Sequence, residues 1–188
     1  MKLLTLALFA ILLIVTVRGM FFSFGSQKPG DYAESGPAFI LKEHLSGPIL
    51  SEGLIYGPTG RVTNSFTAQM QGEWDGDTGT LTESFTYSNG QTQERKWFLT
   101  ASSDNTFTAT AEDIIGEAQG VVSGSTIMMT YKIVLPERAG GHVLSVTDWL
   151  YMTESGVIIN RSEMRKFGIK VAELVATMRP SREGNTGD

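Results

Sequence analysis

Between residues 49 and 178, apolar and polar side chains alternate in short segments, which is the pattern of β-strands that bury one face. Each segment ends at turn residues, such as Asn89-Gly90, that favour tight hairpins. The segments cover residues 49–56, 61–74, 80–88, 91–101, 106–113, 117–123, 126–135, 142–152, 157–163 and 167–178. Because the links are short, we expect an up-and-down antiparallel meander, and closing such a sheet removes its exposed edges. The pattern therefore predicts an all-β barrel of about ten strands.

Two stretches of the domain depart from this clear alternation. Residues 40–45 fit a short helix that ends at Ser46-Gly47-Pro48. Residues 167–178 fit a strand, but their apolar spacing also fits one face of a helix. We expect a strand there, because a closed meander needs a last strand that pairs with the first.

The N-terminus is apolar without alternation. Residues 3–17 form an apolar run that only Thr5 and Thr16 interrupt. We interpret residues 1–25 as an uncleaved signal anchor, a transmembrane helix that leaves the domain outside the membrane. A cleaved signal peptide is the main alternative and would also export the domain, and a buried core helix is the third.

The rest of the chain divides into a linker, one domain and a tail. Residues 26–38 are rich in glycine and proline, which is typical of a linker. Residues 39–180 are expected to form the barrel, and this length suits one domain rather than two. Residues 181–188 are expected to be a disordered tail.

Several predicted strands place one charged side chain in a row of apolar ones. Alternation puts Glu83, Arg95, Asp148 and Arg161 on the apolar faces of their strands. An isolated ion in an apolar interior is strongly disfavoured, so each needs a partner, a water molecule or a ligand. A three-residue Asn-Gly-Gln loop between their strands places Glu83 opposite Arg95, and a two-residue loop places Asp148 opposite Arg161.

These pairs are candidates for the polar end of a ligand site. Trp97, Tyr131 and Trp149 are candidate walls, although alternation places Trp149 on the face opposite Asp148. Two interpretations stay open: paired ions inside a filled barrel, or a cavity whose polar groups orient the head of an amphipathic ligand. The candidate ligand-binding residues are Glu83, Arg95, Trp97, Tyr131, Asp148, Trp149 and Arg161.

Composition narrows the chemistry. The chain has no cysteine, which excludes disulfides, thiol catalysis and thiolate metal sites. Its two histidines, His44 and His142, do not have the spacing of a metal site. The net charge of -5 is mixed along the chain without a basic stripe, so we expect no nucleic-acid partner. A phosphate-binding loop and a nucleophile elbow are absent, and we expect neither a metal nor a cofactor.

A series of short motifs occurs in a distinctive order along the domain. They are Gly72-Glu73-Trp74-Asp75-Gly76, Gly79-Thr80-Leu81-Thr82-Glu83, Arg95-Lys96-Trp97, Asp113-Ile114-Ile115-Gly116, Asp148-Trp149-Leu150-Tyr151, Ile159-Asn160-Arg161 and Lys166-Phe167-Gly168. Over residues 31–179 this series resembles the DUF3833 family of bacterial envelope proteins. The resemblance implies a lipocalin-like (calycin-type) barrel at the Gram-negative envelope, without defined catalytic residues. Many relatives look like Cys-anchored lipoproteins, and this chain departs from them because it has no cysteine.

Binding or carrying an apolar ligand, such as a fatty acid or another lipid, is the function that these features lead us to expect. The expected location is the bacterial inner membrane with the domain facing the periplasm, or the periplasm itself after signal-peptide cleavage. The expected partners are the membrane, through the N-terminal segment, and an apolar small molecule. The alternatives are an envelope scaffold that binds other proteins, and a lipid-modifying accessory, hydrolase or isomerase that uses Asp148 or Glu83 for acid–base chemistry.

Overall fold

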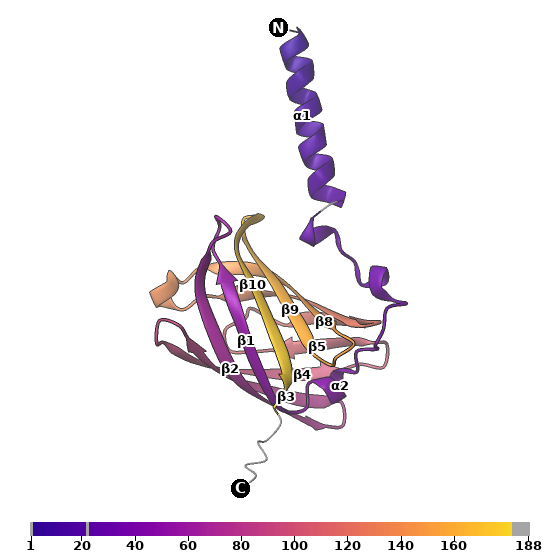
Figure 1. Ribbon diagram of the computed structural model, residues 1–188, viewed down its shortest axis with the longest axis vertical. Coiled ribbons are helices and arrows are strands. Elements are labelled where there is room, and N and C mark those ends of the chain that lie inside the picture. Colours follow the sequence, from indigo (N-terminus) through magenta and orange to yellow (C-terminus); the bar gives the residue numbers. More distant parts are fainter. Residues whose placement is uncertain (1, 22, 182–188) are drawn as a thin grey trace.

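Each alternating segment becomes a strand in the computed structural model, which describes residues 2–21 and 23–181. The strands are β1 (Gly47–Tyr56), β2 (Val62–Asp75), β3 (Thr78–Tyr87), β4 (Thr92–Ala101), β5 (Thr106–Thr110), β6 (Ala118–Ser123), β7 (Thr126–Val134), β8 (Val143–Met152), β9 (Ile158–Lys166) and β10 (Ile169–Pro180). Each pairs antiparallel with the strands before and after it in the chain, and β1 also pairs with β10 (Figure 1). The predicted closed meander is confirmed, and the ambiguous last segment is a strand.

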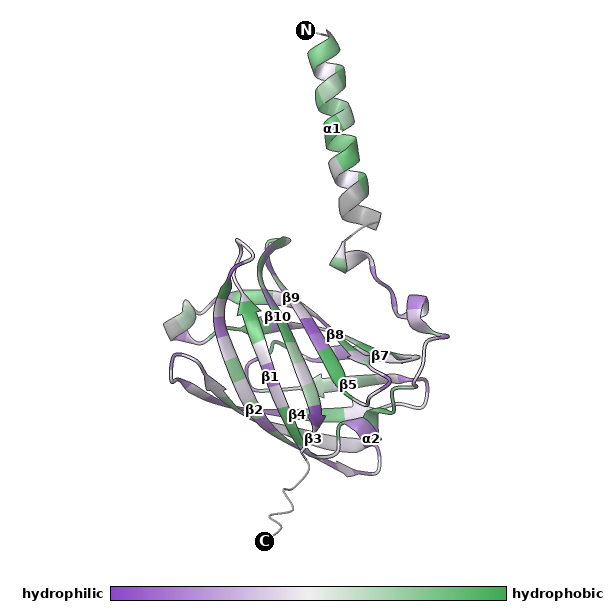
Figure 2. Cartoon of the chain, in the orientation of Figure 1, coloured by the Kyte–Doolittle hydropathy of each residue, from purple (hydrophilic) through white to green (hydrophobic). Residues whose placement is uncertain are grey.

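Burial follows the alternation of the sequence, most clearly in β2. Phe66, Ala68 and Met70 point into the barrel and are buried, whereas Thr67 and Gln69 between them are exposed. Figure 2 shows apolar and polar residues succeeding one another along the strands. The hydrophobic core is therefore the interior of the barrel.

A short helix closes one end of the barrel, as the sequence predicts. α2 (Leu41–His44) lies at this end (Figure 1). Leu41, and Leu45 just after the helix, are buried in the core. The indole Nε1 of Trp74 donates a hydrogen bond to the carbonyl oxygen of Leu45 at 3.0 Å. A Cβ at Gly72 would overlap the backbone of Leu45, so only glycine lets the chain approach β2 this closely.

The opposite end of the barrel carries loops. The links that lie here are β1–β2, β3–β4, β5–β6, β7–β8 and β9–β10. The β7–β8 link contains the 3-10 turn η3 (Glu137–Ala139). Phe167, at the tip of the β9–β10 hairpin, is 94% exposed. This end is therefore covered less tightly than the end that α2 closes.

The N-terminal helix extends away from the barrel. α1 (Lys2–Phe21) projects from it in Figure 1, and the leucines of α1 are exposed, Leu3 to 87%. Among residues 2–21 and 23–181, no helix is long and apolar enough to cross a membrane. That residues 1–25 form a signal anchor stays a prediction. The exposure of α1 goes against the buried-helix alternative.

The predicted linker, residues 26–38, packs along the outer surface of the barrel. After the 3-10 turn η1 (Phe24–Ser26), a second turn, η2 (Pro29–Tyr32), contacts β6 and β7. The hydroxyl of Ser123 donates a hydrogen bond to the carbonyl oxygen of Pro29 at 2.6 Å. Of the predicted disordered tail, residues 182–188 lie outside the described residues.

One of the two predicted strand registers is confirmed and the other is wrong. Glu83 lies opposite Arg95, as predicted. Asp148 lies opposite Ser162 and not opposite Arg161. Because side chains alternate between faces, this one-residue shift turns Arg161 to the outer face of β9.

The length of the hairpin loops explains both results. In each hairpin three residues separate the last hydrogen-bonded pair of strand residues, and the third is a glycine with positive φ, 82° at Gly90 and 76° at Gly156. The first loop is Ser88-Asn89-Gly90, which is centred on Asn89 as the pair Glu83–Arg95 requires. The expected loop, Asn89-Gly90-Gln91, has the same length but would place Glu83 opposite Trp97. The second contains Glu154, Ser155 and Gly156, whereas the prediction assumed two residues.

Candidate functional site

The barrel encloses a cavity of about 400 Å³. It extends from Leu45, at the end that α2 closes, to Leu135 and Pro136 in the β7–β8 link. Its lining is mostly apolar and includes Phe66, Met70, Leu81, Phe107, Ile127 and Leu150. The interior is therefore hollow, which decides against the filled-barrel interpretation.

A second hollow lies on the outside of the barrel, over β1, β2, β3, β9 and β10. Its volume is about 610 Å³, and exposed side chains such as Glu52, Thr67 and Thr86 contribute to it. It contains none of the buried charged residues of the interior. The enclosed cavity is therefore the stronger candidate for a functional site.

Arg95, on β4, lies against two aromatic rings on the cavity wall. Its guanidinium carbon is 4.1 Å from the ring centroid of Trp97 and 5.8 Å from that of Tyr131, and the two rings meet edge to face at 5.3 Å. Asp113, in the β5–β6 link, accepts from Arg95 Nε at 3.1 Å and lies 3.0 Å from Nη2. The guanidinium is therefore fixed in place, and one carboxylate already balances its charge.

Glu83, on β3, faces Arg95 from the neighbouring strand and is only 7% exposed. Its Oε2 atom has no hydrogen-bond partner among the described residues. Burial raises the pKa of Glu83 to about 7, with Arg95 opposing the shift and the carboxylates of Asp148 and Asp113 adding to it. Near neutral pH this carboxyl group therefore exchanges between its ionised and neutral forms.

Asp148, on β8, is the third acidic group of the cavity. Ser162 Oγ donates a hydrogen bond to Asp148 Oδ1 at 2.6 Å, and Asn160 Nδ2 donates to the same oxygen. Burial raises the pKa of Asp148, and these two hydrogen bonds oppose the shift. Burial also raises the pKa of Tyr131, so its phenol stays neutral. Asp148 thus has donors within the protein, whereas Glu83 Oε2 has none among the described residues.

The structure brings most of the predicted site residues together. Those that line the cavity are Glu83, Arg95, Trp97, Tyr131 and Asp148. They come from four strands, β3, β4, β7 and β8, whose inward faces meet inside the closed sheet. That these residues bind a ligand stays a prediction.

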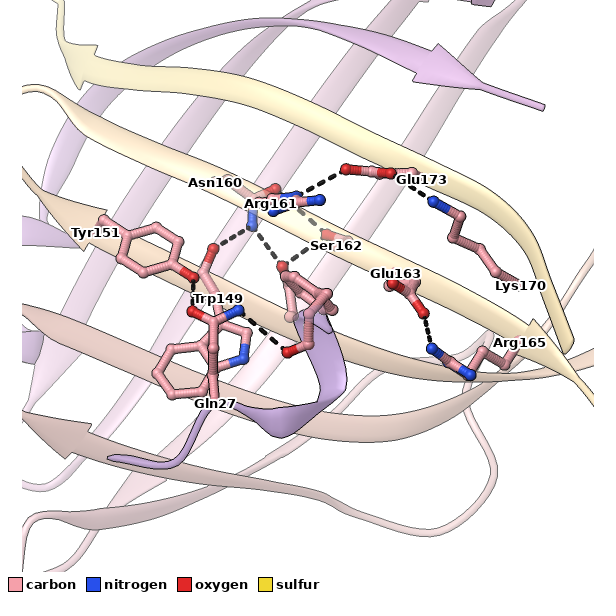
Figure 3. A network of polar contacts seen from close by, with 12 residues as sticks. Gln27, Trp149, Tyr151, Asn160, Arg161, Ser162, Glu163, Arg165, Lys170 and Glu173 are labelled. Atoms are coloured by element: carbon pink, nitrogen blue, oxygen red, sulfur yellow. Dashed lines mark hydrogen bonds and ion pairs between the residues drawn. The ribbon is translucent and has the colours of Figure 1, made fainter. Parts of the chain in front are cut away.

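Trp149 and Arg161 lie on the outer wall instead (Figure 3). Trp149 is fully buried there, with its ring 5.3 Å from that of Tyr32 and 5.9 Å from that of Tyr151. Arg161 Nε donates to Glu173 Oε1 at 2.7 Å. Trp149 lies on the outer face of β8, because alternation turns it away from the inward-facing Asp148. Arg161 points outward because the pairing of β8 with β9 is shifted by one residue from the predicted one. Neither side chain therefore borders the cavity.

The outer-wall residues bind the N-terminal segment to the barrel. Tyr151 Oη donates a hydrogen bond to Gln27 Oε1 at 2.7 Å (Figure 3). Glu163, on the outer face of β9, is 5% exposed and forms an ion pair with Arg165. This network therefore serves packing on the face opposite to the cavity.

Among the polar cavity residues that the sequence does not single out, Asp113, Asn160 and Ser162 contact the charged cluster. Alternation assigns Asp113 to the end of a strand, whereas it lies in a link, from which its side chain reaches Arg95. Asn160 and Ser162 were placed on the outer face by the wrong β9 register. A three-residue loop ending in Gly156 would have placed both of them inside. Within residues 2–21 and 23–181, no group of three or more His, Asp or Glu residues is placed to hold a metal ion.

Three solved structures share the barrel fold with this chain. An S-type phycobiliprotein lyase, CPES, from Guillardia theta aligns with a TM-score of 0.58 and 6% identity over 77% of this chain and 92% of that one. Rv2717c from M. tuberculosis aligns with a TM-score of 0.54 and 15% identity over 79% and 100% of the two chains. A DUF3598-family protein of unknown function from Nostoc punctiforme aligns with a TM-score of 0.53 and 10% identity over 77% and 51%. At these identities the likeness establishes the fold alone.

Sequence comparison identifies the family. No curated protein matches the chain. The family described as "protein of unknown function (DUF3833)" matches residues 19–180, which include the packed N-terminal segment and all the strands of the barrel. The chain therefore belongs to the DUF3833 family.

Proposed function

We propose that the barrel binds an amphipathic small molecule, with its apolar part in the cavity and its polar head at the cluster of Glu83, Arg95 and Asp148. The observation that carries this proposal is Glu83 Oε2, a buried carboxylate oxygen on the cavity wall without a partner among the described residues. Buried polar atoms are nearly always hydrogen-bonded, so this oxygen needs a donor that none of the described residues supplies. A ligand head group would supply it.

The size and lining of the cavity support the same proposal. Its volume of about 400 Å³ lies within the range of roughly 300–1,000 Å³ of small-molecule sites. Leu81, Phe107 and Ile127 are among the apolar side chains that an alkyl chain would contact. Burial of such a chain contributes about 0.8 kcal/mol per methylene group. A lipid or another long-chain amphiphile meets these requirements.

Filling the cavity should remove binding. Met129 lines the cavity, whereas Thr130, the next residue on β7, is exposed on the outside. We expect Met129→Trp to weaken the binding of an apolar dye such as N-phenylnaphthylamine by at least about tenfold, because the indole takes the space of the ligand. Thr130→Trp is the matched control and should leave the affinity unchanged. Equal dye affinity in both variants, measured by fluorescence titration, would contradict the proposal.

Mass spectrometry of the native protein can identify the ligand. We expect the protein, purified without detergent, to release an amphiphile that is absent after delipidation. Identical spectra before and after delipidation would remove the support for a carrier role.

The remaining expectations from the sequence stay predictions. A scaffold role predicts that Met129→Trp has no effect on function in the cell. Acid–base catalysis predicts that Asp148→Asn or Glu83→Gln abolishes turnover without loss of folding or of dye binding, and the pKa of Glu83 near 7 suits such chemistry. Location at the bacterial envelope and contact with a membrane through the N-terminal segment are likewise predictions.

A further inference from the structure

The ionisable groups of the cavity are unequally divided between acids and bases. Glu83, Asp113 and Asp148 are carboxylates, and Arg95 is the one basic group among the described residues that line the cavity. With all four ionised, the polar end of the cavity carries an excess of negative charge. A negatively charged head group would add to that excess in an environment of low dielectric constant.

Arg95 is poorly placed to offset a negative ligand, because Asp113 already balances the charge of its guanidinium, although Nη2 makes an ion-pair contact and no hydrogen bond. Asp113 is 3.1 Å from Nε and 3.0 Å from Nη2. Trp97 covers one face of the guanidinium at 4.1 Å. A carboxylate ligand could pair with Arg95 only by displacing Asp113 and leaving that acid without its partner.

On the cavity wall, two polar atoms lack a hydrogen bond among the described residues, Arg95 Nη2 and Glu83 Oε2. Arg95 Nη2 has an ion-pair contact with Asp113, whereas Glu83 Oε2 has no partner of either kind and therefore needs a hydrogen-bond donor. Glu83 Oε2 lies on the cavity wall, is more than nine-tenths buried and has no partner among the described residues. An ionised carboxylate oxygen only accepts hydrogen bonds, so a second carboxylate cannot satisfy it, whereas an ammonium or hydroxyl group can. Asp148 differs, because Asn160 and Ser162 already donate to it.

We infer that the head group of the ligand donates hydrogen bonds to Glu83 and carries no negative charge, as in a long-chain amine or alcohol, and that a fatty acid is not the preferred ligand. This inference rests on the proposed function, because it assigns the head group within the same cavity. It narrows the ligand class from amphiphiles in general to neutral or cationic ones. It also reverses the fatty-acid expectation drawn from the sequence.

Competition between matched amphiphiles tests the inference. The full chain, loaded with N-phenylnaphthylamine, is titrated with dodecylamine, dodecanol and dodecanoate, which share an alkyl chain and differ in the head group. At about pH 8.5, above the pKa of Glu83, we expect the amine and the alcohol to displace the dye at about tenfold lower concentration than dodecanoate. Dodecanoate competing equally or better would overturn the inference and leave the proposed function intact. Failure of the dye and of all three amphiphiles to bind would overturn the proposed function itself.

Glu83→Gln tests whether Glu83 is the group that selects the head. The variant keeps an acceptor oxygen but removes the negative charge, so the preference for dodecylamine over dodecanoate should fall by about tenfold. Glu163→Gln is the matched control, because Glu163 is equally buried but lies on the outer wall, and the preference should stay unchanged. An unchanged preference in Glu83→Gln would contradict the assignment.

A pH series on the unmodified chain gives the same test without a substitution. The groups that face Glu83 are Arg95 from β4, Asp113 from the β5–β6 link, Tyr131 from β7 and Asp148 from β8. Lowering the pH to about 5.5 protonates Glu83, so the disadvantage of dodecanoate should shrink. A preference that is constant between the two pH values would exclude Glu83 as the selecting group.

Discussion

Glu83 and Glu163 are both glutamates with less than a tenth of their surface exposed, yet their surroundings give them different roles. Glu163 lies on the outer wall and is paired with Arg165. Glu83 faces the cavity beside an arginine that is turned to Asp113, and its Oε2 is left without a partner among the described residues. A buried carboxyl group without its own cation is costly when ionised, which is why burial raises the pKa of Glu83 to about 7.

The raised pKa of Glu83 makes the stability of the fold depend on pH. From the usual pKa of 4.5 up to about 7 the folded state binds more protons than the unfolded state, so the free energy of unfolding falls as the pH rises through this range. The contribution of Glu83 is up to roughly 3 kcal/mol. Glu83→Gln should remove this part of the decline and be more stable than the unmodified chain at about pH 8. Urea unfolding at the low-pH and high-pH ends of this range measures the free energy of unfolding of both proteins. Parallel pH profiles for the two proteins would contradict the raised pKa of Glu83.

At the scale of elements, the length of one hairpin loop decides which side chains enter the cavity. Strand positions follow from alternation and from Gly-containing turns, so all the strands, the closing of the sheet and the pair Glu83–Arg95 could be predicted from the sequence. The β8–β9 loop could not, because Glu154-Ser155-Gly156 fits a two-residue or a three-residue turn, and hydrophobic pattern does not separate them. The three-residue loop places Ser162, and not Arg161, on the inner face of β9.

Replacing a turn glycine and a packed glycine by alanine should destabilise the fold by different amounts. Gly156→Ala meets open space and is strained only by its φ of 76°, so we expect a loss of about 1 kcal/mol in the free energy of unfolding. Gly72→Ala drives a Cβ into the backbone of Leu45, so we expect about 3 kcal/mol and a loosened α2. Urea unfolding gives the stabilities, and hydrogen exchange of the amides of 41–45 reports on α2. Equal losses in the two variants would contradict the role of Gly72.

At the scale of the whole molecule, closing the sheet creates the cavity. The sequence predicts the closed sheet, but alternation alone does not distinguish a hollow barrel from a filled one, because that depends on how inward side chains from all strands meet. The pairing of Arg95 with Asp113 also joins residues from a strand and a distant link, and it leaves Glu83 unmatched. The predicted row of ion pairs is therefore a cavity in which Glu83 Oε2 has no partner among the described residues.

The positions of the tryptophans allow a direct test of ligand location. Trp97 lines the cavity, whereas Trp149 is buried on the outer wall. Trp74 donates a hydrogen bond to the carbonyl oxygen of Leu45, just after α2. Each can be made the sole tryptophan by replacing the other two with phenylalanine. Bromine quenches indole fluorescence on contact, so a bromine-terminated undecanol reports which tryptophan it touches. We predict saturable quenching of the variant that retains Trp97 and none of the variant that retains Trp149. Equal quenching of both, or no quenching of Trp97, would contradict binding inside the barrel.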